Sequence, residues 1–328
     1  MKEDNPNSKT VSPERRNFLK ACALSLGAAA AGVVFYSKEP VKRQEGKIHV
    51  LKDHRVVIPG VYPKLCIVHG KDVLKMVTAA VEKLGGISKF VEKGQRVLLK
   101  PNVGWDRQPE IAANTNPEVV AAMVTLCLSA GAKEVWVTDV SINDPFRSFA
   151  RSGIEPAVLK AGGKVKIPTE NDFLSTDLKG EILKVWPVVS FLHQADRVIN
   201  IPVLKHHSLS KCTLSMKNWY GILGAKRNRL HQEINISISD LAAAVKPTLT
   251  VMDATRVLKR NGPTGGNLAD VSAENTIIAG TDEVAIDACC LKYLDLKTED
   301  VAFLKIAEAR GTGTSDWKNA LRHEEFSV

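Results

Sequence analysis

The sequence lacks the short motifs that identify the commonest nucleotide, hydrolase and metal sites. It contains no Gly-rich loop ending in Gly-Lys-Ser/Thr, and no Gly-x-Gly-x-x-Gly, Gly-x-Ser-x-Gly or His-Glu-x-x-His. None of its six cysteines forms a Cys-x-x-Cys pair, and Cys289 and Cys290 are adjacent. The spacing that iron–sulfur clusters and structural zinc require is therefore absent. The motifs in the sequence therefore indicate no particular cofactor or metal.

Long apolar runs are also scarce. After about the first 40 residues, no apolar run approaches the roughly 20 residues of a membrane-spanning helix. Hydrophobic residues make up 44% of the chain and charged residues 25%, which is typical of soluble globular proteins. We therefore expect a water-soluble body that does not span a membrane.

The first 40 residues have the layout of a twin-arginine export signal. Arg15 and Arg16 precede Phe18-Leu19-Lys20 and then a mildly apolar, Ala-rich segment, residues 21–35. The alternative is an arginine pair that precedes an apolar helix by chance. The signal predicts transport of the folded protein by the twin-arginine translocase to the periplasm or beyond, with a membrane tether if the segment is not cleaved. The predicted organisation is a signal over 1–40, a linker over 41–60 and an α/β domain over 61–328, which has room for two sub-lobes.

The chain carries a net charge of +9, and much of the excess lies between Lys205 and Arg229. Such an excess suits nucleic acid, an anionic surface or an acidic small molecule. An exported protein rarely meets nucleic acid, so we expect an anionic small molecule as the ligand and no nucleic acid.

Short apolar strands alternate with amphipathic helices along the body of the chain. This alternation predicts an α/β fold with a mainly parallel sheet and helices on both faces. The strands are expected at 65–68, 97–99, 134–138, 185–189, 198–201, 249–252 and 275–279, and the helices at 72–84, 116–129, 155–160, 236–245, 282–294 and 301–309.

Polar residues follow several of these strands directly, at the edge where ligands bind in open parallel sheets. The segment from Lys205 to Gly221, expected to be a loop followed by a helix, adds ammonium, imidazole, hydroxyl and amide groups, which are the donors that a phosphate or carboxylate needs. We expect a shared cleft at this edge. The predicted catalytic residues are His206, Asp139 and Asp253, with His206 as the acid or base. The predicted ligand-binding residues are Lys100, Asn102, Lys205, His207, Lys217 and Asn218, and Lys226 and Arg227 extend the cationic set.

A shared metal ion at His206 and His207 is not expected, because adjacent side chains point in different directions on most backbones. Cys66 and Cys127 lie in apolar elements and are most simply interpreted as small residues of the hydrophobic core. No spacing predicts a disulfide.

Several segments of the chain match one known family in the same order. They are Val-Leu-Leu-Lys-Pro-Asn (97–102), Thr-Asn-Pro (115–117), Ala-Gly-Ala (130–132), Val-Thr-Asp (137–139), Ala-Asp (195–196), Ile-Asn-Ile-Pro-Val-Leu-Lys-His-His (199–207), Leu-Ser-Met-Lys-Asn-Trp-Tyr-Gly (214–221), Val-Met-Asp (251–253), Gly-Pro (262–263) and Thr-Asp-Glu-Val-Ala-Ile-Asp-Ala (281–288). Through these segments the chain resembles the family called domain of unknown function 362. The resemblance spans roughly residues 65–295 and implies the same α/β fold and site, but no reaction. Some members of that family carry an appended ferredoxin-type domain, for which this chain lacks the cysteines. A more remote likeness, as an analogy only, is to the nickel-pincer lactate racemase family.

Two functions are consistent with these features. The first is an exported protein that binds, and in one version acts on, an anionic small molecule in the cleft. The second is a non-enzymatic accessory or binding protein for a periplasmic redox or cell-envelope system. Whether the protein is an enzyme stays open at this point.

Overall fold

The computed structural model describes residues 46–58 and 60–328. The predicted signal, 1–40, lies outside these residues. The described residues fall within one compact unit, Glu45–Val328. None of the helices in this part of the chain combines the length and apolar composition needed to cross a membrane.

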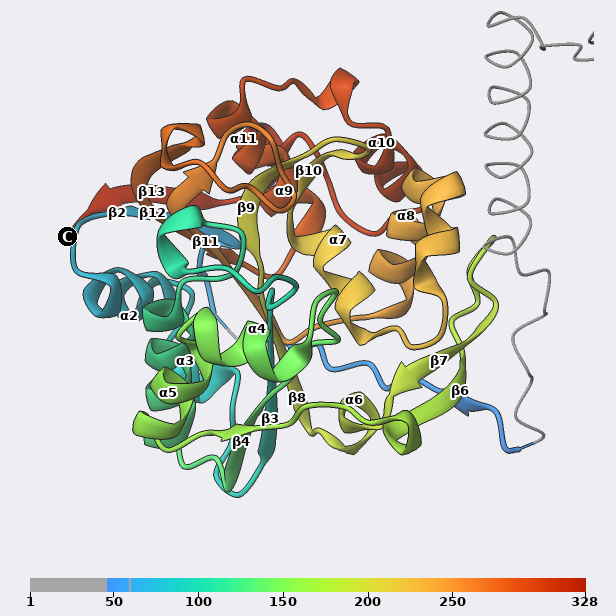
Figure 1. Ribbon diagram of the computed structural model, residues 1–328. Helices are drawn as coiled ribbons and strands as arrows, with labels where there is room; N and C mark the ends of the chain where they lie inside the picture. Colours follow the sequence, from blue (N-terminus) through green and yellow to red (C-terminus); the bar gives the residue numbers. More distant parts are fainter. Residues whose placement is uncertain (1–45, 59) are drawn as a thin grey trace, which may run out of the picture. The chain divides into compact units, whose positions relative to one another are not determined.

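A ten-stranded, mainly parallel sheet runs through the centre of this unit, as the sequence predicts (Figure 1). Strand β12 is antiparallel to both of its neighbours, and β9 and β10 form an antiparallel hairpin beside β11. The other pairings in the sheet are parallel. The order is β13 (His323–Ser327), β2 (Leu65–His69), β12 (Val271–Gly280), β11 (Leu249–Leu258), β8 (Arg197–Ile201), β3 (Arg96–Pro101), β4 (Glu134–Val137) and β5 (Lys164–Val165), with β9 (Val203–His207) and β10 (Lys211–Thr213) off this path.

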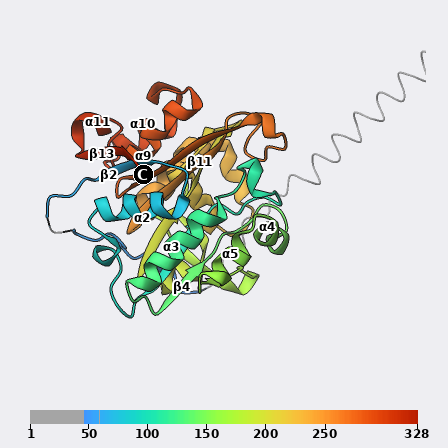
Figure 2. The ribbon, with the colours of Figure 1, turned by 90° about the vertical axis from the view of Figure 1, so that its left-hand side faces the viewer.

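Helices cover both faces of the sheet, because alternate strand residues point to opposite sides. In β3, Leu98 belongs to one buried cluster and its neighbours Val97 and Leu99 belong to the other. Figures 1 and 2 show α2, α3 and α5 together on one side, with α8, α9 and α10 away from them. The helices are α2 (Val73–Lys83), α3 (Pro117–Ser129), α4 (Pro145–Arg151), α5 (Ile154–Lys160), α6 (Ser190–Gln194), α7 (Ser215–Asn218), α8 (Ile234–Ala244), α9 (Glu283–Cys290), α10 (Ala302–Ala309) and α11 (Trp317–Ala320).

Helix α3 begins as the sequence predicts. Asn116 is its N-cap, and the Asn116 side chain accepts a hydrogen bond from the backbone N–H of Glu118. Pro117 follows in the first turn, where a backbone N–H would have no partner within the helix, so its lack of one costs nothing. The backbone N–H of Asn116 donates to Asp253 at 2.7 Å. The start of α3 is thereby fixed against β11.

A second, three-stranded sheet consists of β1 (His49–Val50), β6 (Phe173–Asp177) and β7 (Val185–Val189). Strand β1 lies within the segment predicted as a linker, 41–60. The same segment contributes the buried ring of His54 and a bridge from Asp53 to Lys246. Residues 49–54 thus pack against the body of the domain.

Two strand predictions differ from the structure in a way that matters for the site. Strand β11 continues to Leu258 instead of ending near Asp253. The segment from Lys205 to Gly221, predicted as a loop and helix, begins as the β9–β10 hairpin and only then enters α7. Both corrections move predicted strand-end residues into strand interiors.

Candidate functional site

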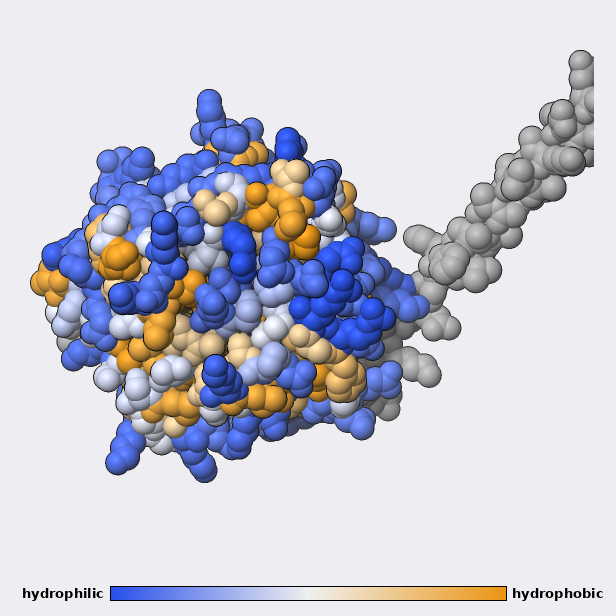
Figure 3. Space-filling model, turned by 60° about the vertical axis from the view of Figure 1, so that its left-hand side comes forward, coloured by the Kyte–Doolittle hydropathy of each residue, from blue (hydrophilic) through white to orange (hydrophobic). Residues whose placement is uncertain are grey.

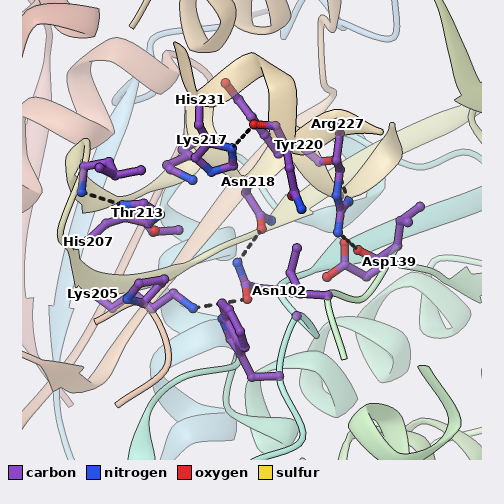
Figure 4. A pocket seen from close by; sticks show the side chains of 18 of the residues that line it. Asn102, Asp139, Lys205, His207, Thr213, Lys217, Asn218, Tyr220, Arg227 and His231 are labelled. Atoms are coloured by element: carbon purple, nitrogen blue, oxygen red, sulfur yellow. Dashed lines mark hydrogen bonds between the residues drawn. The ribbon is translucent and has the colours of Figure 1, made fainter. Parts of the chain in front are cut away.

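A pocket of about 460 Å³ lies at the carboxyl ends of β3 and β4, and residues of β9, β10 and α7 also line it (Figure 4). Its position is the edge of the sheet at which the sequence predicts a cleft. The lining residues include Lys100, Asn102, Asp139, Lys205, His207, Thr213, Lys217, Asn218, Tyr220, Gly221, Arg227 and His231.

A buried ion pair forms the floor of the pocket. Lys100 Nζ lies 2.8 Å from Asp139 Oδ1, and the two side chains are 1% and 3% exposed. Burial lowers the pKa of Lys100, against the opposing effect of Asp139. The other carboxylate oxygen of Asp139 accepts the backbone N–H of Val103 at 2.6 Å. Gly221 packs so closely on this pair that a Cβ at that position would overlap both charged groups.

A chain of hydrogen-bonded asparagine side chains also fixes the position of Lys100. Asn218 Oδ1 accepts hydrogen bonds from Lys100 Nζ at 3.0 Å and from Asn102 Nδ2 at 3.1 Å. The amide nitrogen of Asn218 donates to Asn200 Oδ1 at 2.8 Å, and Asn200 in turn donates to Glu283 at 2.6 Å. Glu283 accepts from each of its partners, so it fixes the orientation of both amides and, through them, the position of Lys100.

Lys205 lies in the middle of β9, and its ammonium makes two hydrogen bonds within the described residues. Its ammonium donates to the carbonyl of Ala113 and to Asn102 Oδ1, the latter at 3.5 Å. Burial and, after it, the charge of Lys217 lower the pKa of Lys205 well below its ordinary value.

Lys217 differs from the other two lysines. It is 8% exposed, and its Nζ lies 4.9 Å from the centre of the Tyr220 ring. Within residues 46–58 and 60–328, no hydrogen bond or carboxylate engages this ammonium. Burial, followed by the charge of Arg227, lowers the pKa of Lys217 to about 7.

Arg227 and two histidines complete the polar wall. The Arg227 guanidinium donates to the carbonyls of Tyr220 at 2.8 Å and Val140 at 2.5 Å. The His207 and His231 rings stack with centroids 6.3 Å apart. Burial, followed by the charge of Lys217, lowers the pKa of both histidines, which favours their neutral forms.

The two imidazoles have opposite hydrogen-bonding roles. His207 Nδ1 accepts the backbone N–H of Leu209 at 3.1 Å, which leaves the ring proton on Nε2. His231 Nδ1 donates to the carbonyl of Asn228 at 3.0 Å, which leaves Nε2 as an acceptor. The pocket therefore contains one imidazole donor and one imidazole acceptor.

The predicted site residues separate into two groups. Lys100, Asn102, Asp139, Lys205, His207, Lys217 and Asn218 line the pocket, whereas His206 and Asp253 do not. His206 is adjacent in β9 to two lining residues, so alternation along the strand turns it away, and its Nδ1 accepts the N–H of Gly262 at 3.1 Å. Asp253 lies inside β11 and accepts hydrogen bonds from Asn116 and Thr255.

Several lining residues carried no strand-end signal in the sequence. Thr213, Tyr220 and His231 come from the hairpin and the 3₁₀ turns around α7, segments whose path depends on tertiary contacts. Arg227 lies in the cationic set that the sequence singles out, while its neighbour Lys226 is exposed and outside the lining.

The described residues contain no group of three or more His, Cys, Asp or Glu side chains that could hold a metal ion. The five cysteines at 66, 127, 212, 289 and 290 are buried and free. The side chains that line the pocket offer ammonium, guanidinium, imidazole, amide, carboxylate, hydroxyl and phenol groups.

The rim of the pocket is partly apolar. Ile142 and Leu209 line it while remaining 49% and 61% exposed. Figure 3 shows one face of the molecule, on which apolar patches lie among a majority of hydrophilic side chains. Small-molecule sites combine apolar lining side chains with polar groups that fix the orientation of the ligand.

Comparison with known proteins adds a family match and distant structural likenesses. The model described as "Domain of unknown function (DUF362)" matches residues 97–292. A thylakoid-associated protein of Synechocystis sp. is 28% identical over 255 residues, which cover 73% of this chain and 75% of that protein.

Two solved structures resemble the chain more remotely. They are the lactate racemase apoprotein of Thermoanaerobacterium thermosaccharolyticum, with 10% identity, a TM-score of 0.39 and 74% of this chain covered, and a Thermotoga maritima protein, with 12% identity, a TM-score of 0.36 and 72% covered. The chain spans 58% of the length of each.

Proposed function

The chain belongs to the DUF362 family, and from the geometry of its pocket we propose that it binds a small anionic molecule between Lys205, Lys217 and Arg227. All of the lining residues lie within the part of the chain that the family model matches, 97–292. The volume of the pocket, about 460 Å³, suits a metabolite-sized ligand.

The charge of the pocket carries this proposal. Its lining includes four cationic side chains, of Lys100, Lys205, Lys217 and Arg227, and a single carboxylate, of Asp139. Burial lowers the pKa of all four groups. Repulsion from a neighbouring cation lowers the pKa of each of the three lysines further. An anion relieves the repulsion and adds charge-assisted hydrogen bonds, each of about 1.5–3 kcal/mol.

Two pocket groups are available to such an anion. The ammonium of Lys217 has no hydrogen bond within the described residues, and the buried hydroxyl of Thr213 likewise lacks a partner there. Buried donors are normally satisfied, so an unpartnered donor in a cavity is suited to a ligand acceptor.

Sulfate is therefore expected to raise the melting temperature of the protein above its value in chloride of the same ionic strength. An anion that binds only the native state stabilises it by mass action, by about 2.7 kcal/mol when the anion is present at 100 times its Kd. Lys205→Met and Lys217→Met should each abolish this increase, as measured by thermal unfolding at pH 6.5.

Lys179 supplies the matched control, because its side chain is exposed and outside the pocket. Lys179→Met should keep the full sulfate effect. Without sulfate, Lys217→Met should be as stable as the wild type or more stable near neutral pH. The folded-state pKa of Lys217, about 7, lies below its ordinary value of 10.5, so the penalty of burying its charge is complete below pH 7 and disappears as the pH rises towards 10.5. Equal sulfate effects in all four proteins would refute the proposal.

Sulfate affinity should also fall as the pH rises above 7. Bound sulfate raises the pKa of Lys217 from its value of about 7 in the empty pocket, so binding above pH 7 requires proton uptake and weakens by up to about tenfold per pH unit for each proton. Sulfate keeps one charge state between pH 6 and 9, so calorimetric titration over that range reports the protein groups alone. A Kd that does not change with pH would show that Lys217 is not in contact with the anion.

We also propose that the protein works outside the cytoplasm after twin-arginine export. The support is the arrangement of Arg15, Arg16 and the apolar segment 21–35 in the sequence. This segment lies outside the described residues.

A further inference from the structure

We propose that Lys217 is a nucleophile that forms an imine with the carbonyl group of a 2-oxo acid, whose carboxylate is held by the neighbouring cations of the same pocket. This inference rests on the proposed anion binding and names the class of ligand and its chemistry. It assigns a role to Lys217, whose ammonium is the one among the three pocket lysines that has no hydrogen bond within the described residues.

The three buried lysines of the pocket are not equivalent as nucleophiles. Lys100 is held by Asp139 and Asn218, and Lys205 by the Ala113 carbonyl and Asn102. Hydrogen bonds of this kind occupy the amine and fix its position. Lys217 has no hydrogen bond within the described residues, and its Nζ lies over the face of the Tyr220 ring, so its amine can approach a carbonyl carbon in the cavity.

The electrostatic surroundings of Lys217 favour its neutral, nucleophilic form. Of the groups around it, Arg227, Lys100 and Lys205 are cationic, and His207 and His231 are imidazoles. Cys212 acts in the opposite direction and raises the pKa of Lys217. The only carboxylate in the lining, that of Asp139, is paired with Lys100. The pKa of Lys217 is lowered to about 7, so close to half of the amine is neutral at neutral pH. An ordinary lysine is neutral in only about one molecule in three thousand at that pH. Desolvation and adjacent cations activate lysine nucleophiles in this way.

The cations around Lys217 also favour a ligand in which the carbonyl group is bonded to a carboxylate. Arg227 and Lys100 line the same pocket as Lys217 and act on it electrostatically, so an anionic group bound to them lies in the cavity that its amine also lines. In a 2-oxo acid the carbonyl carbon is bonded directly to the carboxylate. Anchoring the carboxylate on the cations therefore brings the carbonyl carbon towards Lys217 Nζ.

The reaction is balanced without an oxidant or reductant. The neutral amine adds to the carbonyl carbon, and a proton moves from nitrogen to the former carbonyl oxygen, giving a carbinolamine. The remaining proton on the nitrogen is then transferred to that oxygen, which leaves as water, and a carbon–nitrogen double bond replaces the carbon–oxygen double bond. Both steps need a proton acceptor and a proton donor, and His231 Nε2 and His207 Nε2–H supply one of each within the pocket.

Reductive trapping tests this proposal on the wild-type chain. The protein is treated at pH 7 with sodium cyanoborohydride and either pyruvate or 2-oxoglutarate, and the modified lysines are located by peptide mass spectrometry. We expect a stable adduct on Lys217 that forms at least tenfold faster than on exposed lysines such as Lys211, and that sulfate suppresses by competition. Lys211→Met, in the same hairpin region, should not change the labelling of Lys217.

The variant Lys217→Arg should retain cationic charge and lose the fast adduct, with its folding checked by thermal unfolding. Labelling spread evenly over exposed lysines, with Lys217 unmodified by both acids, would overturn the imine proposal. If sulfate still stabilised the protein in that case, anion binding would stand and only the imine would fall. If sulfate also had no effect, both would fall.

Discussion

Replacing Gly221 by alanine is expected to destabilise the protein by about 3–5 kcal/mol, the cost of breaking a buried ion pair. A Cβ at position 221 would overlap the carboxylate of Asp139 and the ammonium of Lys100. Both side chains are buried and held by further hydrogen bonds, so neither can move without leaving a charge unpaired. Urea denaturation of Gly221→Ala should show this loss, and sulfate should no longer raise the melting temperature.

Gly104 provides the matched control for this experiment. It also lines the pocket, but a Cβ there would meet only ordinary contacts, at 3.6 Å from Asn102 and 3.8 Å from Ile142. Gly104→Ala should change the free energy of unfolding by less than about 1 kcal/mol. Equal stability of the two variants would contradict the close packing of Gly221 on the ion pair.

Changing both Arg15 and Arg16 to lysine is expected to block export almost completely. The twin-arginine translocase reads the arginine pair itself, and lysine keeps the charge while removing the guanidinium group, so the result separates recognition from a general need for positive charge. The double variant should accumulate in the cytoplasm as a folded protein, as measured by fractionation and immunoblotting.

The control for this variant is Arg43→Lys, which makes the same chemical change outside the predicted signal. It should be exported at the wild-type level. If the double variant reached the periplasm as efficiently as the control, the export proposal would be wrong.

The strands and helices of the fold were largely predictable because their signals are local. The apolar runs at 65–68 and 97–99 fall within β2 and β3, and the Asn116-Pro117 pair marks the start of α3. The mainly parallel sheet follows from the alternation of these elements. The antiparallel course of β12 was not predictable, since nothing in a strand's own residues specifies the direction of its partner.

The site was predictable where a strand ends and not where one continues. Lys100 and Asp139 follow apolar residues at true strand ends, so they reach the pocket. Asp253 follows an apolar run in the same way as Lys100 and Asp139. Strand β11, however, continues for five more residues to Leu258, so Asp253 stays within the sheet. His206 was also expected in the cleft and does not line the pocket. The hairpin makes its segment a strand, in which neighbouring side chains point to opposite sides.

The measurement that tests anion binding most directly is a crystal structure of the protein with selenate, a sulfate analogue whose selenium is located by anomalous scattering. Crystals grown near pH 6 keep Lys217 protonated, since its pKa is about 7. We expect an anomalous peak in the pocket, with selenate oxygens within hydrogen-bond distance of Lys217 Nζ and no such peak in crystals of Lys217→Met. An empty pocket at a selenate concentration that raises the melting temperature, with the anion bound elsewhere on the surface, would contradict the proposed function.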